Sequence, residues 1–155
     1  MRCVVQRSGP ALVRIEGETV GRIDSGLVVL AAFGPDDTTA ELSWMARKLP
    51  RLRIFNDTDG KMNLSLRDVG GGILLVSQFT LYGNCRKGMR PSFTGSAPPE
   101  RARKLYEEFG HLLRGEWPTV AEGNFGAMME VELVNDGPVT LVVDREISGE
   151  AGSDD

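Results

Sequence analysis

The run Ile-Leu-Leu-Val-Ser-Gln-Phe-Thr-Leu-Tyr-Gly occupies residues 73–83 and follows three glycines at 70–72. Its first four residues are uniformly apolar, and a short apolar run that begins after a turn signal is typical of a buried strand. Ser77, Gln78 and Thr80 then continue the run with polar groups, which are costly to bury without hydrogen-bond partners. Two interpretations stay open: the strand leaves the core at this point, or these polar groups face a ligand.

Strand-like segments occur on both sides of this run, each bounded by turn residues. They are residues 3–7, 11–15, 19–23, 27–33, 53–55, 129–133 and 139–143. The segment 27–33 is apolar throughout, which is typical of a central strand, whereas 129–133 alternates as a half-buried antiparallel strand does. Turns are expected at 8–10 and at 135–138, the second of which would join the last two strands.

Two helices are expected between these strands. Thr38 and Glu41 have the spacing of a capping box, and an apolar stripe at helical spacing follows as far as Pro50. The second helix is expected to begin at Pro98. Its apolar stripe consists of Ala102, Leu105, Tyr106, Phe109, Leu112 and Leu113.

The order of these elements predicts the fold class. Roughly seven or eight strands and two principal helices, not in strict alternation, predict an α+β fold with a mainly antiparallel, barrel-like sheet. No repeat or linker is evident, so a single domain is expected over residues 1–146. The tail 147–155 is small and acidic, and it is expected to be disordered.

The composition narrows the functional classes. The chain has 155 residues, of which 41% are hydrophobic and 26% charged, as in an ordinary soluble globular protein. No stretch is apolar enough to span a membrane and no signal peptide is evident, so a cytoplasmic protein without membrane contact is expected. Cys3 and Cys85 are expected to be free thiols in a reducing compartment.

The net charge argues against a protein that coats nucleic acids without regard to sequence. The net charge is −4, so DNA binding is not expected, although a local basic patch could still bind one end of an RNA. Arg86, Lys87 and Arg90 directly follow the run at 73–83 and are the better candidates for such a patch. The cations at 101, 103 and 104 are interpreted as the solvated face of the second helix.

His111 is the single histidine of the chain. It lies off the apolar stripe of its helix and is therefore expected at the surface. No Ser–His triad and no His/Cys metal cluster can be built, so no metal and no other cofactor is expected. The paired aspartates of the loop 56–60 lack the spacing of a calcium loop and are interpreted as a turn.

Gly137-Pro138 is a turn signal within the last part of the chain. An X–Pro bond can be cis at low cost, but only about 5–6% of such bonds in folded proteins are cis. From spacing alone, a trans bond is therefore expected.

Two motifs together resemble those of a known family. Ser-Gln-Phe-Thr-Leu at 77–81 and Asn-Asp-Gly-Pro-Val-Thr at 135–140 are similar to motifs of the D-aminoacyl-tRNA deacylases of the bacterial and eukaryotic type. Further matching segments lie at 5–7, 53–55, 60–63 and 88–93, so the resemblance covers essentially residues 1–144. A sister family that edits other mischarged tRNAs carries Pro-Gln-Ala-Thr in place of residues 77–80.

The resemblance implies the fold of that family and a homodimer that hydrolyses the ester between a D-amino acid and the 3′ end of tRNA. Glycine mischarged on tRNA would also be accepted. Gly137-Pro138 would be cis and would reach into the partner's site, where its carbonyls would meet the substrate's amino group and exclude an L side chain.

The resemblance also assigns roles around the run at 73–83. Ser77 and Gln78 would lie against the terminal adenosine, and Phe79 and Thr80 would border the scissile ester. The 2′-hydroxyl of the RNA would assist catalysis in place of a side-chain base.

The residues leave two other functions open. One is a non-catalytic RNA-end binder that uses residues 86–90, and the other is a hydrolase of another small ester or amide with Thr80 as the nucleophile. A threonine hydroxyl without an adjacent base is a poor nucleophile. Positioned reactants, with backbone N–H groups near Phe79 and Thr80 as oxyanion donors, can supply catalysis without such a base.

Overall fold

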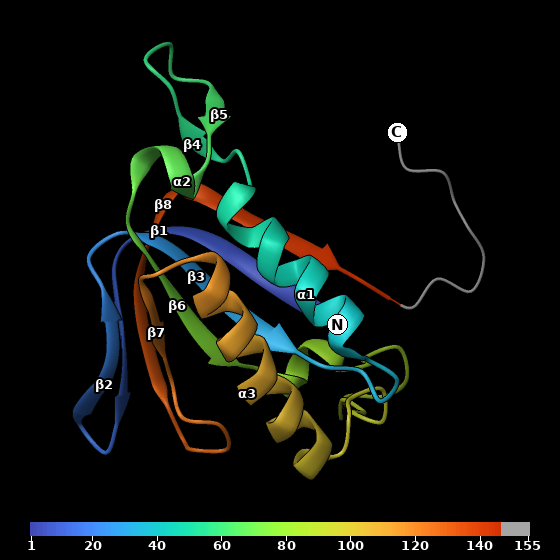
Figure 1. Cartoon of the computed structure of the whole chain (residues 1–155). Coiled ribbons are helices and arrows are strands. Elements are labelled where there is room, and N and C mark those ends of the chain that lie inside the picture. Colours follow the sequence, from blue (N-terminus) through green and yellow to red (C-terminus); the bar gives the residue numbers. More distant parts are fainter. Residues whose placement is uncertain (147–155) are drawn as a thin grey trace.

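A computed structural model describes residues 1–146 of the chain, and the predicted acidic tail at 147–155 lies outside this part (Figure 1). The main sheet has the strand order β2-β1-β3-β6-β7, and β8 pairs with β1 along its other edge. β1 is antiparallel to β2, β3 and β8, whereas β6 is parallel to both β3 and β7. These strands are β1 (Arg2–Ile15), β2 (Glu18–Ile23), β3 (Gly26–Ala32), β6 (Gly72–Ser77), β7 (Val120–Glu122) and β8 (Glu130–Asp144).

The sheet curves until its outer strands meet. A Cβ atom on Gly21 of β2 would lie 2.7 Å from the carbonyl oxygen of Glu122 in β7, so a glycine is required for this close approach. β2 and β7 accordingly lie side by side (Figure 1). The predicted α+β fold with a barrel-like sheet is confirmed, and two parallel pairings accompany the antiparallel ones.

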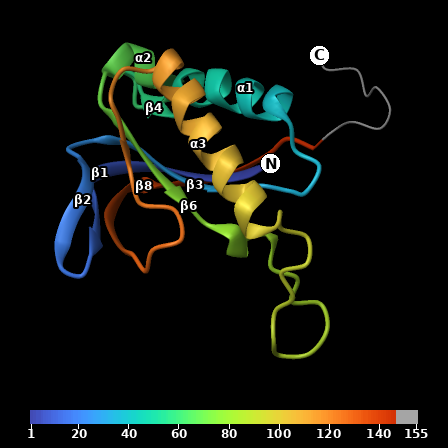
Figure 2. The ribbon, with the colours of Figure 1, turned by 60° about the horizontal axis from the view of Figure 1, so that its bottom comes forward.

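Two long helices, α1 (Thr39–Lys48) and α3 (Pro99–Glu116), cover one face of the sheet (Figure 2). The short helix α2 (Leu66–Val69) precedes β6. The predicted capping box is present, because the Thr38 N–H donates to Glu41 Oε2 at 2.9 Å and the Thr38 hydroxyl oxygen accepts from the helix backbone. The apolar stripes predicted for both helices face the sheet, and His111 is exposed as expected.

Both faces of β3 and β6 are buried, which explains why their sequences are continuously apolar. Leu27, Val29 and Leu75 belong to the core beneath the helices. Val28 and Val76, which point the other way, belong to a second cluster inside the curved sheet. The central position of the run at 73–83 is therefore confirmed for its first part.

The turns expected at 8–10 and 135–138 are wrong, because β1 and β8 each continue through these positions. Both halves of β8 pair with β1 rather than with each other. Gln6 pairs with Thr140 and Ser8 with Asn135, so residues 136–139 bulge from β8 opposite the single residue Arg7. The hairpin was mispredicted because this long β1 takes both halves of β8 as partners.

The strand expected at 53–55 begins only at Phe55. β4 (Phe55–Asn56) and β5 (Met62–Leu64) form a short hairpin outside the main sheet. Its loop is a turn as predicted: the Asp57 carboxylate accepts the N–H groups of Asp59 and Lys61. The hydrogen bond from Lys61 is the main cause that lowers the pKa of Asp57.

Cys3 is buried and Cys85 is exposed, and both are free thiols, as predicted. Within residues 1–146, no helix is long and apolar enough to cross a membrane.

Candidate active site

A groove of about 630 Å³ lies at the C-terminal end of β6. Three segments that are far apart in the sequence form its walls: the end of β6, the start of α3 with the loop before it, and the connection from β7 to β8 (Figure 1). The lining residues are Val76, Ser77, Gln78, Phe79, Phe93, Ser96, Ala97, Pro98, Pro99, Ala102, Phe125, Gly126, Ala127, Met128, Met129 and Val131.

The first wall is the polar end of the run that organises the sequence. The N–H of Gln78 donates to the carbonyl oxygen of Ala31 in β3 at 2.8 Å, which is the last main-chain bond between these neighbouring strands. The chain then turns into a 3₁₀ turn at Phe79–Tyr82. Ser77 and Gln78 are half-buried and line the groove, so the structure favours the interpretation in which these polar groups face a ligand.

Phe79 and Thr80 differ in their relation to the groove. Phe79 is 55% exposed and packs edge-on against Phe93, with 5.3 Å between the ring centroids. The Thr80 side chain is exposed and does not line the groove; its hydroxyl accepts a hydrogen bond from the Gln78 amide. The structure therefore brings Ser77, Gln78 and Phe79 together, with Thr80 beside them.

The 3₁₀ turn leaves main-chain donors free at its start. The first N–H groups of a helical turn have no partner within the turn. Within residues 1–146, no acceptor takes the N–H of Phe79 or of Thr80, whereas the following N–H of Leu81 donates to Gln78. Two adjacent free N–H groups next to a groove can bind a negatively charged oxygen.

The opposite wall was not predicted from the sequence. It consists of residues 125–129, and Met128 is 92% exposed there. The buried Tyr106 hydroxyl holds this wall against β6, because it lies 3.1 Å from the carbonyl oxygen of Leu75 and 3.4 Å from that of Gly123. Burial raises the pKa of Tyr106, which keeps the hydroxyl protonated as a donor. The only signal for this wall was the glycine-containing connection before β8.

The chemical character of the lining is unusual for a candidate active site. In the part of the chain that the structure describes, none of the lining side chains carries an acid, base or thiol that titrates between about pH 4 and 9. Among residues 1–146, no group of three His, Cys, Asp or Glu side chains is placed to hold a metal ion. The groove therefore offers main-chain groups, an amide and hydroxyls for chemistry, within apolar walls.

Gly137 and Pro138 lie outside the groove of their own chain. The peptide bond between them is cis, so the trans bond expected from spacing is wrong and the bond implied by the family resemblance is present. Both residues are exposed on the bulge of β8. The bulge is held from within by Arg7, whose Nε donates to the carbonyl oxygen of Asp136 at 2.9 Å. Arg7 was not singled out as a site residue, because an arginine in a strand is ordinarily exposed.

The predicted basic patch also lies outside the groove. Arg86, Lys87 and Arg90 are exposed in the long loop between the 3₁₀ turn and α3. This loop begins at the groove wall and returns to it at Phe93, since Asn84 and Ser92 pair through main-chain hydrogen bonds. The three cations are thus close to the groove in the chain without lining it.

Comparison with known proteins identifies the family. A family model described as D-Tyr-tRNA(Tyr) deacylase matches residues 4–144. The D-aminoacyl-tRNA deacylase of Desulfatibacillum aliphaticivorans is 57% identical over 146 residues, which are 94% of this chain and 100% of the relative. That of Thermosipho africanus is 56% identical over 94% of this chain and 98% of the relative.

The chain belongs to the D-aminoacyl-tRNA deacylase family.

Solved structures with the same fold are also known. A structure titled as a probable eukaryotic D-amino acid tRNA deacylase has the same fold, with a TM-score of 0.81 over 93% of this chain and 98% of that one, at 21% identity. A second structure, titled c-Myc DNA Unwinding Element Binding Protein, has a TM-score of 0.89 at 39% identity. It covers 95% of this chain and 100% of that one. The deacylase family is a family of hydrolases, so the groove at the end of β6 is the candidate active site of an enzyme.

Proposed function

We propose that the protein is an aminoacyl-tRNA editing hydrolase of the cytoplasm. It cleaves the ester between a D-amino acid, or a mischarged glycine, and the 3′-terminal ribose of tRNA, and it rejects L-aminoacyl-tRNA. Membership in the deacylase family supports the reaction. The reaction is assigned to the groove at the end of β6.

The single observation that carries the proposed mechanism is the absence of ionisable side chains from the groove lining in residues 1–146. A positioned side-chain base contributes about 10²–10⁴-fold, and this groove must do without one. In the proposal, the 2′-hydroxyl next to the ester takes that role. The protein contributes orientation, for which effective molarities reach about 10⁵–10⁸ M.

The free N–H groups of Phe79 and Thr80 serve as the oxyanion donors of this mechanism. One such donor is worth about 2.7–4 kcal/mol in the transition state of acyl transfer. Ser77 and Gln78, which directly precede Phe79 in the chain, bind the terminal adenosine. Thr80 acts through its main chain, because its hydroxyl is exposed and no side-chain base within residues 1–146 hydrogen-bonds to it.

The proposed chiral selection requires a second copy of the chain. Gly137 and Pro138 are exposed and do not line their own groove, so they act on the groove of a partner in a homodimer. Exposed apolar side chains on the same strand support an interface: Val134 is 59% and Val142 64% exposed. In the partner's groove, the rigid main chain clashes with an L side chain, and glycine escapes the clash because it has no side chain.

The basic patch of Arg86, Lys87 and Arg90 binds the phosphates of the 3′ end in this proposal. It lies on the loop that joins two walls of the groove, and cations dominate affinity for nucleic-acid backbones. No cofactor and no DNA take part.

The test is to load tRNA with D-tyrosine or L-tyrosine and to follow the loss of each ester. The proposal requires hydrolysis of the D form at a rate at least about a hundredfold above that of the L form. Equal rates for both hands would refute it. Binding of tRNA without turnover would instead identify a non-catalytic RNA-end binder.

A further inference from the structure

A second, shallower depression lies on the outer surface of α1, away from the active-site groove. It has a volume of about 330 Å³ and is lined by Trp44, Arg47, Lys48, Arg51 and Leu52, which we call the α1 furrow. Three of the five lining residues are cations and none is acidic. The residues between Glu41 and Asp57 include no acid, whereas the chain as a whole carries a net charge of −4.

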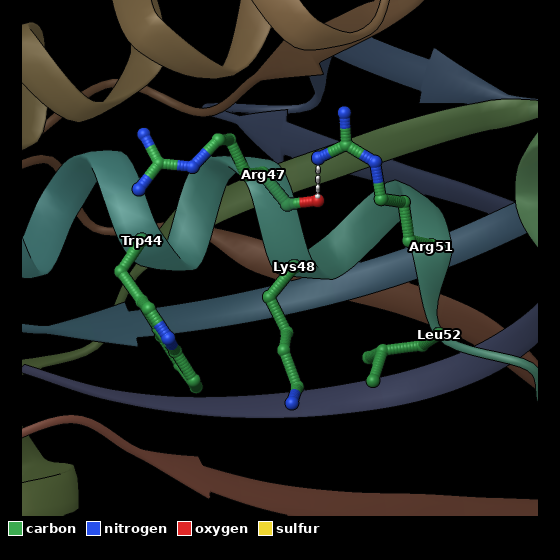
Figure 3. A pocket seen from close by; sticks show the side chains of 5 residues that line it. All are labelled: Trp44, Arg47, Lys48, Arg51 and Leu52. Atoms are coloured by element: carbon green, nitrogen blue, oxygen red, sulfur yellow. Dashed lines mark hydrogen bonds between the residues drawn. The ribbon is translucent and has the colours of Figure 1, made fainter. Parts of the chain in front are cut away.

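The helix arranges the furrow as two rows. Trp44, Arg47 and Lys48 lie on α1, Arg51 lies in the 3₁₀ turn Leu49–Arg51 that follows the helix, and Leu52 comes directly after that turn. Residues four apart on a helix lie on the same side, so Trp44 and Lys48 form one row, and Arg47 and Arg51 form the other. Figure 3 shows the two rows projecting to opposite sides of the helix, with Arg47 and Arg51 on one side and Trp44 and Lys48 on the other. Cationic side chains therefore flank the helix on both sides.

Contacts within the chain hold the rows without neutralising them. The Lys48 ammonium lies 5.0 Å from the Trp44 ring centroid, and the Arg145 guanidinium lies 5.1 Å from the same ring. Arg51 donates to the main-chain oxygen of Arg47 at 2.7 Å, drawn as the dashed line in Figure 3. These contacts align the side chains and leave their positive charge in place.

Acidic residues offset only part of this charge. Arg51 forms an ion pair of 3.2 Å with Glu116, which also pairs with Arg67. Within residues 1–146, Arg47 and Lys48 have no carboxylate within ion-pair distance. The furrow thus keeps an excess of positive charge at the surface.

The length of α3 gives the approximate distance between the α1 furrow and the active-site groove. Ala102 lines the groove, and Glu116, about fourteen residues further along α3, pairs with Arg51. At about 1.5 Å per residue, α3 separates the two sites by about 20 Å. One phosphate occurs about every 3.4 Å along one strand of a duplex, so about six phosphates span this distance.

We propose that the α1 furrow binds the phosphate backbone of the tRNA body while the 3′ end occupies an active-site groove. This inference rests on the proposed function for its partner, a tRNA. The furrow contributes affinity and salt dependence to substrate binding, and it takes no part in ester cleavage.

The test uses a double variant, Arg47→Gln with Lys48→Gln, in the full chain. The matched control is Arg22→Gln with Lys61→Gln, which removes the same two charges from exposed positions on β2 and on the β4–β5 hairpin. Binding of uncharged tRNA is measured between 50 and 200 mM salt. Hydrolysis is measured on D-tyrosyl-tRNA and on a D-tyrosylated CCA trinucleotide.

The furrow variant is expected to bind tRNA at least about tenfold more weakly at 50 mM salt, and its slope of log K against log salt is expected to fall by about two. Hydrolysis of the trinucleotide stays unchanged, and the control variant behaves as the wild type. Unchanged tRNA binding, an equal loss in the control, or an equal loss on the trinucleotide would overturn the inference. Failure of the wild type to hydrolyse either ester refutes the proposed function instead, and the binding data still decide the role of the furrow.

Discussion

The Nε of Arg7 in β1 donates a hydrogen bond to the carbonyl oxygen of Asp136 in β8, at 2.9 Å. The same buried guanidinium donates through Nη1 to the carbonyl oxygen of Ile54 at 2.7 Å and to the Asn56 side chain at 3.2 Å. Arg7 thus ties the bulge that carries Gly137 and Pro138 to the segment before the β4–β5 hairpin. The orientation of the exposed bulge therefore depends on a side chain from the interior.

Arg7→Lys is expected to weaken both stability and chiral selection. A lysine cannot reproduce the planar fork of donors, and the buried carbonyl oxygens that lose their partner cost about 1–3 kcal/mol each. We expect the free energy of unfolding to fall by about 2–4 kcal/mol and the ratio of D to L hydrolysis to fall at least about tenfold. Denaturant unfolding and the two hydrolysis rates measure these effects.

Arg14→Lys is the control for this variant, because Arg14 lies on the same strand but forms an exposed ion pair with Glu132. It should leave both quantities within experimental error. If Arg7→Lys is destabilised but retains full discrimination, Arg7 does not set the orientation of the bulge.

Arg2 is expected to support the 3₁₀ turn that contains Phe79 and Thr80. Its Nη1 donates to the carbonyl oxygen of Leu81 at 3.0 Å, its guanidinium lies 5.2 Å from the Tyr82 ring centroid, and it forms a two-point ion pair with Asp144. Arg2→Gln should lower kcat/KM for D-aminoacyl-tRNA by about three- to tenfold, because the turn loses a positioning contact. Steady-state kinetics provide the measurement.

Arg14→Gln is again the matched control, since it breaks a cross-strand ion pair between the same two strands far from the turn. Equal losses in both variants would show that Arg2 acts only through general stability. A loss confined to Arg2→Gln supports its positioning role.

Thr80→Val removes the hydroxyl and keeps the main-chain N–H. Because catalysis is assigned to that N–H and not to the hydroxyl, we expect kcat to stay within about tenfold of the wild type. Rapid-quench experiments should show no acyl-enzyme. A loss beyond about 10⁴-fold, or a trapped ester on Thr80, would identify the hydroxyl as a nucleophile instead.

The cap of α1 is expected to make stability sensitive to acid. Burial of Glu41 opposes its ionisation, but hydrogen bonds from the Thr38 hydroxyl and N–H outweigh this effect and lower the pKa of the carboxyl. A lowered folded-state pKa gives stability that is present above the unfolded value of about 4.3 and is lost as the pH falls through the folded value.

Thr38→Ala should therefore lower the free energy of unfolding by about 1 kcal/mol at pH 7, with a smaller difference from the wild type below about pH 4. Denaturant unfolding at several pH values measures this difference. A constant difference at all pH values would show that the cap does not act through the ionised Glu41.

The sequence correctly predicted elements that are recognisable from neighbouring residues alone, such as an apolar run or a helix cap. The run at 73–83 and the capping box of Thr38 and Glu41 are of this kind, because burial and capping follow from neighbouring residues. Part of the candidate site was predictable for the same reason, since Ser77 and Gln78 are polar residues directly after a buried strand.

The features that the sequence did not predict depend on contacts between residues that are distant in the chain. The bulge at 136–139 exists because two halves of β8 share one partner strand, and a single sequence does not reveal this register. Arg7 supports the site only through contacts that are distant in the sequence, because its partners Asp136 and Ile54 lie 129 and 47 positions away from it. Likewise, residues 125–129 form a groove wall only because Tyr106 holds their connection against β6.

The most direct test of catalysis by the RNA hydroxyl uses D-tyrosyl-tRNA whose terminal nucleotide is 2′-deoxyadenosine, with the amino acid on the remaining 3′-hydroxyl. Because the groove lining within residues 1–146 has no titratable side chain, we expect hydrolysis to fall at least about a hundredfold relative to the normal RNA terminus, while binding changes little. Hydrolysis of the deoxy substrate at the normal rate would contradict it, because the reactive base would then have to come from the protein.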